Sequence, residues 1–460
     1  MLLRCSKAWT PYRVPIRRFD DPIGFEPSMR RMKNQNDRLY QEDLMFRLYN
    51  TMDRQITPFR PRNGEEVKMF TCGPSIYGRP HLGNYRTFLW EDVLERYLEY
   101  LGYKVRRVMN LTDIEDKALV EAERIGTDVK DLTEANARHF QEECRLLGIA
   151  VPEYLPRSST SVEQAVELIR ILLEKGVAYE YRGDVFFDPL KVKGFGRLYG
   201  LDMSRWPTKK RRFKQDTYPG RRWNLGDFIL WHGCGSTDTA CWDTPMGRGR
   251  PSWNIQDPAM IMKYLGSEID IACGGIDNLH RHHDYNLAVM EAFSGKEFCR
   301  HWMHCEHLLV RGKKMSKSIG NIIYLEDLLR DGFTGRQIRF YLLFGEHRVR
   351  QSFTSLQFEK ACGVLAELRS MMTGLAPKGG ESISPNRQRE ATGAIVEVFE
   401  QCMNENLNVK AAVHGLLGAL EQAAELQARG RLSEQGRGDI QSQLRRVDGV
   451  LQVLYDEEPA

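Results

Sequence analysis

The sequence predicts an α/β fold, a doubly wound parallel sheet with an inserted mixed subdomain, followed by an all-α helical bundle. Residues 67–72 form a short apolar run that ends in Gly-Pro, the pattern of a buried strand before a turn. Residues 80–102 then carry apolar side chains at helical spacing. A second strand candidate at 104–109 and a second helical pattern at 110–126 repeat this order. Such a rhythm is typical of a parallel sheet that binds ligands at the carboxyl ends of its strands.

The rhythm breaks between about residues 156 and 243, where an insertion is expected, and strand-like and helical pieces resume from 268 to 310. After about Gly332 the chain is predicted to be entirely helical. Two apolar stripes mark core-facing helices there: Val413, Leu416, Leu417 and Leu420, and then Ile440, Leu444, Val447, Leu451 and Leu454. We therefore expect a catalytic region at 45–332 and a helical bundle at 333–460.

The composition is that of a globular protein. The 460 residues are 42% hydrophobic, and 66 basic residues stand against 62 acidic ones, a balance that neither requires nor excludes a nucleic-acid partner. No stretch approaches the roughly 18 apolar residues of a membrane helix, so we expect no membrane association. Ten cysteines without a CxxC pair predict reduced thiols in a cytoplasmic protein rather than a disulfide framework.

Residues 1–44 form an N-terminal extension. Its first nineteen residues contain no acidic side chain but five basic ones, Arg4, Lys7, Arg13, Arg17 and Arg18. That composition occurs in organellar targeting segments. Because no clear amphipathic helix forms and Asp20 and Asp21 follow at once, we favour a disordered arm or a start codon placed too early, with Met45 as a natural start.

A first motif lies where the first strand turns into the first helix, at Pro80-His81-Leu82-Gly83-Asn84. Backbone N–H groups at a helix N-terminus attract phosphate, and Gly83 lets a nucleotide approach closely. His81 could donate a hydrogen bond to a phosphate oxygen as charge develops. Taken alone, the motif is more often explained by a histidine that merely caps the helix.

A second motif, Lys314-Met315-Ser316-Lys317-Ser318, follows a strand candidate and precedes Ile319 and Gly320. Its two ammonium groups, three residues apart on a short loop, could stabilise the charge of a departing pyrophosphate when the loop closes over a triphosphate. The competing interpretation is a solvated basic turn.

Together the two motifs match the signatures of class I aminoacyl-tRNA synthetases in order and separation. The resemblance is closest to the cysteinyl-tRNA synthetase family and covers about residues 47–420. The segments that carry it are FTCGPSIYGRPHLGNYRTFLWEDVLERYLEYLGYKVRRVMNLTDIEDK, which contains the first motif, WDTPMGRGRPSWNIQDPAM, GGIDNLHRHHDYN and HLLVRGKKMSKSIGN. The resemblance implies a Rossmann-type domain that uses ATP and Mg²⁺ to activate an amino acid and transfers it to tRNA.

The resemblance also implies roles for particular residues. His81, Lys314 and Lys317 would be catalytic, with Lys317 as the strongest single candidate. The ATP site would comprise Gly73, His81, Gly83, Asn84, Gly275, Asp277, Val310, Lys314 and Lys317. The amino-acid pocket would comprise Cys72, Thr112, Trp253, Asp257, His282 and Asn286.

The chain departs from this family at its zinc site. The family holds zinc with two cysteines, a histidine and a glutamate, and the matching positions here are Cys72, Asp257, His282 and Asn286. A neutral amide is a poor zinc ligand and a carboxylate is harder than a thiolate. Cys72, Asp257 and His282 could still form a three-ligand site, with neighbouring His283 or Asp284 as substitutes. Otherwise the pocket selects an amino acid other than cysteine.

The acceptor is a second open question. Residues 361–460 contain ten basic and fourteen acidic side chains, and we expect no counterpart of the family's C-terminal anticodon-binding region, which weakens the tRNA interpretation. A basic stretch from Lys209 to Arg222 could instead bind an acceptor stem. The alternatives are transfer to a small amine or a carrier protein, and a non-catalytic binding protein, which two intact phosphate-handling motifs disfavour.

Overall fold

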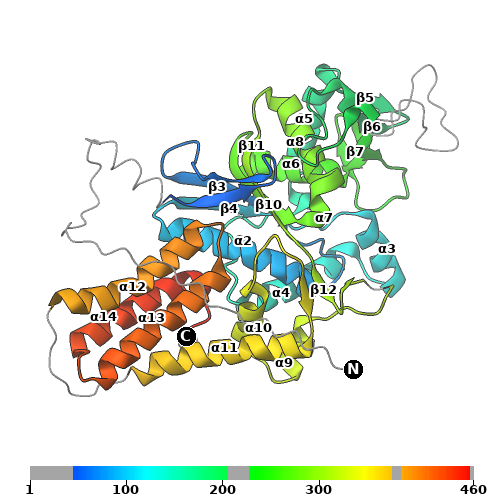
Figure 1. Ribbon diagram of the computed structural model, residues 1–460. Helices are drawn as coiled ribbons and strands as arrows, with labels where there is room; N and C mark the ends of the chain where they lie inside the picture. The colour runs from blue at the N-terminus through cyan, green and yellow to red at the C-terminus, as the bar shows by residue number, and fades with distance from the viewer. Residues whose placement is uncertain (1–44, 206–226, 317, 376–384, 456–460) are drawn as a thin grey trace, which may run out of the picture. The chain divides into compact units, whose positions relative to one another are not determined.

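A computed structural model describes residues 45–205, 227–316, 318–375 and 385–455. The N-terminal extension, the basic stretch at 209–222 and Lys317 lie outside the described residues. Four parallel strands in the order β11-β10-β3-β4 form the central sheet, which confirms the predicted fold class (Figure 1). The strands are β3 (Glu66–Thr71), β4 (Lys104–Met109), β10 (Ile269–Gly275) and β11 (Cys299–Cys305).

Helices cover both faces of this sheet. Successive residues of a strand point to opposite faces, so each strand packs against helices on both sides. Met69 and Ile271 pack on one face with α2 (Leu82–Tyr100). Phe70 and Ala272 pack on the other, with α6 (Trp253–Tyr264) and α8 (Asp284–Ser294). Strands buried on both faces explain the nearly continuous apolar runs in the sequence.

The region of the predicted insertion contains α5 (Val162–Glu174) and most of a five-stranded antiparallel sheet in the order β5-β6-β7-β9-β8, whose strand β9 lies beyond the predicted end at about residue 243. The strands are β5 (Ala178–Tyr181), β6 (Asp184–Phe187), β7 (Phe228–Gly233), β8 (Trp242–Thr244) and β9 (Gly247–Pro251), and the 3-10 turns η1 (Ser158–Thr160), η2 (Pro189–Lys191) and η3 (Met203–Arg205) lie in the same part of the chain.

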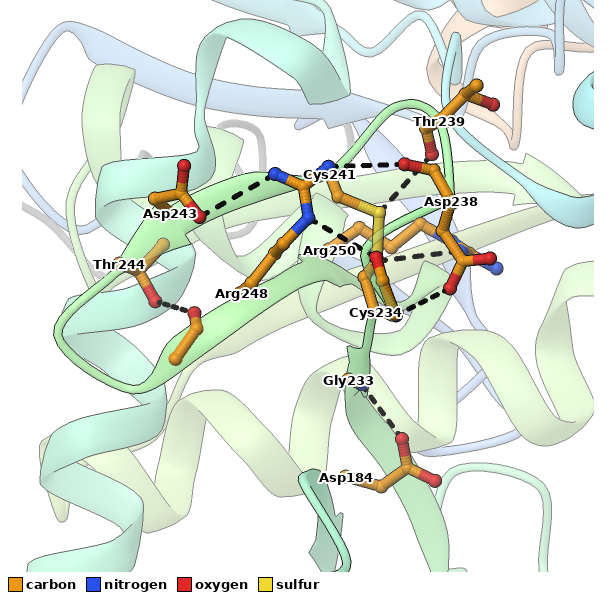
Figure 2. The surroundings of a disulfide bond; sticks show 12 residues. Asp184, Gly233, Cys234, Asp238, Thr239, Cys241, Asp243, Thr244, Arg248 and Arg250 are labelled. Atoms are coloured by element: carbon orange, nitrogen blue, oxygen red, sulfur yellow. Dashed lines mark hydrogen bonds and ion pairs between the residues drawn. A yellow bond between two sulfur atoms is a disulfide. The ribbon is translucent and has the colours of Figure 1, made fainter.

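The prediction of uniformly reduced thiols is wrong for two residues of this insertion. Cys234 and Cys241 form a disulfide across the loop that joins β7 to β8 (Figure 2). Pairing of β7 and β8 with β9 holds the two ends of this loop together, and Cys234 N–H donates to the Arg248 carbonyl at 2.9 Å. A spacing of seven residues carries no CxxC signal, so the sequence pattern could not reveal the pair.

The other elements before the bundle frame the sheet. They are the hairpin β1 (Arg47–Asn50) and β2 (Gln55–Pro58), the helices α3 (Asp116–Ile125), α4 (Val129–Leu146), α7 (Ile276–Asn278) and α9 (Leu325–Arg330), the π-helical turn η4 (Leu279–His283), and the strands β12 (Leu308–Val310) and β13 (Lys313–Lys314).

The C-terminal part is largely helical, as predicted, but not entirely. Strand β14 (Gln351–Phe353) pairs in parallel with β12, and three residues are too few to show an alternating pattern in the sequence. The helices are α10 (Gly335–Leu343), α11 (Ser355–Gly374), α12 (Pro385–Asn404), α13 (Val409–Ala428) and α14 (Glu434–Leu451). The two predicted apolar stripes lie in the main core, where Leu417 is only partly buried. Among the described helices, none has the length and apolarity that a bilayer crossing needs.

A buried ion pair joins the sheet layer to the bundle. Arg339 on α10 donates to Asp92 on α2 at 2.5 Å, and both side chains are 0% exposed. The same guanidinium donates to the Leu451 carbonyl at the end of α14 and to the Leu147 and Gly148 carbonyls after α4. Arg339 therefore connects four segments that lie far apart in the sequence.

We expect Arg339→Met to lower the free energy of unfolding by about 3 kcal/mol, because it removes the guanidinium from a buried carboxylate that keeps, among the described residues, only Arg96 and the Ala150 N–H, and from the Leu147 and Leu451 carbonyls. Urea denaturation followed by tryptophan fluorescence measures the change. Arg330→Met is the matched control, since Arg330 is 72% exposed and pairs with Asp327 at the surface. A loss of stability no larger than that of the control would contradict this role for Arg339.

Candidate functional site

The site lies at the carboxyl ends of β3 and β10, where the sheet order reverses direction. From β3 the chain continues through α2 to β4 on one side, whereas β10 pairs with β3 on the other. Such a point in an open parallel sheet leaves a crevice for a ligand. A cavity of about 420 Å³ occupies it. Ten of the predicted residues line this cavity: Cys72, Gly73, His81, Gly83, Asn84, Thr112, Trp253, Gly275, Asp277 and Lys314.

Four predicted residues do not line the cavity wall. Asp257, His282 and Asn286 lie behind Cys72 and Trp253, buried to 2% exposure or less. Val310 ends β12 and packs, partly buried, against the main core. The structure thus brings together most of the predicted ATP and amino-acid residues, and places a buried polar group beneath them.

His81 both caps α2 and faces the cavity. Its Nδ1 accepts from the Asn84 N–H at 3.3 Å, and Asn84 Oδ1 accepts from the His81 N–H at 3.0 Å. Burial lowers the pKa of His81 below its usual range, and the ammonium of Lys314 lowers it further. A neutral ring that accepts at Nδ1 carries its proton on Nε2. His81 is therefore fixed as a hydrogen-bond donor toward a ligand.

The loop of the second motif lies against the same helix end. Met315 is buried in the core, and a Cβ atom on Gly83 would lie 2.9 Å from its Cε and 3.1 Å from the His81 ring. Asn321 holds the loop backbone, because it accepts from Ser316 N–H and donates to the Lys314 carbonyl. A glycine at position 83 lets the two motifs meet.

Asp277, which follows β10, pairs with the charged Lys314 side chain of this loop. Lys314 Nζ forms an ion pair with Asp277 Oδ2, and His307 Nε2 lies 3.0 Å from Oδ1. Burial by itself raises the pKa of Asp277, but the hydrogen bonds from His307 and Lys314 prevail and lower it to about 2. Asp277 is therefore ionised at neutral pH and competes with any anion for Lys314.

The floor of the cavity is a close contact between the ends of β3 and β4. Gly73 N–H donates to Asn110 Oδ1 at 2.7 Å, and a Cβ atom on Gly73 would lie 2.0 Å from the Asn110 carbonyl oxygen. Asn110 also donates to Thr112 Oγ1 at 3.3 Å. Sequence reasoning did not single out Asn110, although it opens the NLTD segment of the family resemblance.

Beneath the floor, Asp257 on α6 is the centre of a buried polar network. It accepts from Asn110 at 2.9 Å and from Asn286 on α8 at 3.2 Å. His282 Nε2 lies 2.7 Å from Asp257 Oδ2, an ion-pair distance without hydrogen-bond alignment. The imidazole of His282 also stacks on Trp253, with ring centroids 3.8 Å apart.

Three side chains in this region fit a metal ion. The sulfur of Cys72 and one ring nitrogen each of His282 and His283 lie within 4.8 Å of one another. Burial, with the carboxylates of Asp257 and Glu91, raises the pKa of the Cys72 thiol well above its usual value. Burial, with the rings of His304 and His282, lowers the pKa of His283 well below its usual value, so this imidazole is neutral. Of the predicted metal residues, Cys72 and His282 belong to this group, whereas Asp257 contacts it through His282.

The amino-acid sequence of the chain is similar to that of known proteins. Residues 58–363 match the family model for the class I (C) tRNA synthetase catalytic domain. The chain is 35% identical over 411 residues to cysteine--tRNA ligase of Chlamydia pneumoniae, covering 88% of this chain and 86% of the relative. It is 32% identical over 419 residues to that of Protochlamydia amoebophila, covering 90% and 87%.

Solved structures show the same fold at low sequence identity. Mycobacterium tuberculosis methionyl-tRNA synthetase in complex with methionyl-adenylate matches with a TM-score of 0.60 and 16% identity, over 85% of this chain and 90% of that one. An Agrobacterium radiobacter LeuRS in a ternary complex with tRNA and LeuAMS matches with a TM-score of 0.59 and 12% identity, over 91% and 86%.

The parallel sheet, its crevice and the two motifs on either side define the catalytic domain of a class I aminoacyl-tRNA synthetase. Within that class, the match to the family model and the identity to the curated relatives indicate one particular family. The chain belongs to the cysteinyl-tRNA synthetase family.

We expect Gly73→Ala to weaken ATP binding at least about tenfold, because the added Cβ displaces the Asn110 carbonyl and widens the crevice. Titration calorimetry with ATP measures the dissociation constant. Gly363→Ala on α11 is the matched control, because its Cβ would meet nothing within 4 Å, and it should leave ATP affinity unchanged. Equal affinities for the two variants would contradict the assigned function of the Gly73–Asn110 contact.

Proposed function

We propose that the protein activates cysteine with ATP, as cysteinyl adenylate and pyrophosphate, and transfers the cysteinyl group to tRNA. One observation carries this proposal. The N-terminus of α2 and the loop that bears Lys314 approach each other across a cavity at the switch point of the sheet. A triphosphate placed there would meet a helix dipole and a hydrogen-bond donor on one side and an ammonium group on the other.

The two motifs would share the work on the phosphates. His81 donates from Nε2 to a phosphate oxygen, and the positive end of the α2 dipole supports the same charge. Lys314 must exchange its partner Asp277 for the phosphates, whose charge a Mg²⁺ ion bound with ATP would also neutralise. Lys317, by family resemblance, supplies the second ammonium. Because these contacts strengthen as pyrophosphate leaves, they lower the barrier to adenylate formation.

The amino acid would lie deeper, against Cys72, Thr112 and Trp253. These side chains line the cavity at the end nearest the buried Asp257 network. The carboxylate of the substrate then points toward the α-phosphate, and its side chain points toward the floor.

The acceptor in this proposal is tRNA. The curated relatives carry the name cysteine--tRNA ligase, and the relatives cover nearly nine-tenths of this chain. No observation favours a carrier protein or a small amine over tRNA. A non-catalytic role has little support, since His81 and Lys314 both face the cavity with their ring and ammonium groups in place.

Aminoacylation of total tRNA with labelled cysteine tests the proposal. We expect ATP-dependent incorporation into acid-precipitable tRNA that is released by mild base, as an ester is. Incorporation with another amino acid, or none with any of the twenty, would contradict the assigned substrate.

We further expect Lys314→Ala to lower the single-turnover rate of adenylate formation at least about tenfold, which corresponds to about 1.4 kcal/mol of transition-state stabilisation. Lys313→Ala is the matched control, because this neighbouring lysine is exposed and does not line the cavity. Rapid-quench measurement of labelled adenylate compares the two. If both variants react as fast as the wild type, the assigned role of Lys314 is wrong.

A further inference from the structure

We propose that Cys72, His282 and His283 bind a zinc ion, and that the two residues at altered ligand positions, Asp257 and Asn286, support this site from outside the coordination sphere. The inference rests on the proposed function, because it names the group that would recognise the cysteine side chain. It differs from the ligand set that the family resemblance implies, in which positions 257 and 286 bind the metal directly.

The first observation is a pair of buried imidazole nitrogens that lack hydrogen-bond partners in the part of the chain that the structure describes. His283 Nε2 and His282 Nδ1 have no hydrogen-bond partner among the described residues, although the two side chains are 1% and 0% exposed. A buried imidazole nitrogen without a partner costs about 1–3 kcal/mol. Both rings lie with the Cys72 sulfur in a group whose ligand atoms are within 4.8 Å of one another. A metal ion would satisfy all three.

The backbone aims the histidine pair at Cys72. Arg281 has a left-handed conformation (φ 68°), and His280 before it is extended, so the chain kinks immediately before His282. A non-glycine residue in this conformation is strained. The kink ends at α8, where both imidazoles turn toward the sheet and away from solvent.

The orientation of His283 is fixed by two residues of other segments. His283 Nδ1 lies 2.8 Å from His304 Nε2, and His304 Nδ1 lies 2.9 Å from Thr51 Oγ1. If His304 donates to Thr51, its Nε2 accepts the proton of His283 Nδ1, and the lone pair of His283 remains on Nε2. Partners of this kind set the tautomer of metal-binding histidines.

A glycine makes room for that ring. A Cβ atom on Gly274, in β10, would lie 2.7 Å from His283 Cε1 and 3.2 Å from Nε2. Any residue other than glycine at position 274 would therefore place its Cβ atom in the space that the His283 ring occupies.

Asp257 and Asn286 perform the corresponding task for His282. Asp257 lies against His282 Nε2, which leaves Nδ1 available, and it is held by the amide groups of Asn110 and Asn286. A carboxylate behind a metal-binding imidazole orients the ring and raises its basicity. Asn286 stands where the family has a metal ligand. Its amide instead donates to the Asp257 carboxylate and helps to hold that carboxylate in place.

The donor set suits zinc. One thiolate and two neutral imidazoles with an open fourth position match the three-ligand sites of catalytic zinc. An ion held here would offer that position to a sulfur atom in preference to a hydroxyl, because thiolate is the softer ligand.

The experiment measures metal and not catalysis. Zinc content of the purified protein is determined by mass spectrometry, and the apo-protein is titrated with Co²⁺ while thiolate-to-cobalt absorption is recorded. We expect about one metal per chain, no charge-transfer band in Cys72→Ser, and affinity reduced at least about tenfold in His283→Gln. Gly274→Ala and Asp257→Asn should lower affinity about 10–100-fold with the charge-transfer band retained at saturation.

His301→Gln is the matched control. His301 is another buried histidine, on β11, but it packs against Phe59 and does not belong to the metal group. It should bind cobalt as the wild type does, and thermal melting of each variant identifies those that fail to fold. Unchanged affinity in folded His283→Gln, or a protein that binds neither metal, would overturn the inference.

The metal result and the activity result are separable. A metal-free protein that still charges tRNA with cysteine would refute the zinc site and leave the proposed function standing. A protein that binds zinc through these residues but activates no cysteine would do the reverse.

Discussion

The parallel pairing of β3 with β10 is the constraint on which the rest of the structure depends. It joins segments about 200 residues apart, with Cys273 opposite Thr71 and the Cys72 N–H bonded to the Cys273 carbonyl. Because both strands end at the same edge, the turn after β3, the N-terminus of α2 and the segment after β10 meet there. The side chain of Lys314 is paired at that edge with Asp277, so the order of the strands brings together the described groups that would contact ATP.

Burying the polar groups beneath the cavity lowers the stability of the fold, and the packing of the core does not require them. Asp257, His282, His283 and Asn286 are nearly inaccessible to solvent, and several of their polar atoms lack partners among the described residues. Apolar side chains of similar size would fill this space at lower cost. Polar groups held in this way are typical of a site that is shaped before its ligand arrives.

Local patterns were enough to predict the parallel sheet and to locate both motifs, whereas most of the other residues that line the cavity were predicted from the family resemblance. The run before Gly73 and the helix that follows His81 are continuous in sequence, so their periodicity is legible. The disulfide of Cys234, strand β14 and the contact of His304 with Thr51 depend on partners distant in sequence or on segments of three residues. No pattern within one segment reports them. His283 was visible as a substitute ligand, but its orientation follows only from the kink at Arg281 and the space left by Gly274.

The central claim is that a class I synthetase site here selects cysteine. The most direct measurement is amino-acid-dependent exchange of labelled pyrophosphate into ATP, run without tRNA and with each of the twenty amino acids in turn. The proposed zinc site predicts exchange with cysteine and at least about a hundredfold lower kcat/KM with serine, since a thiolate binds zinc much better than a hydroxyl group does. Faster exchange with a different amino acid, or equal rates with serine and cysteine, would contradict it.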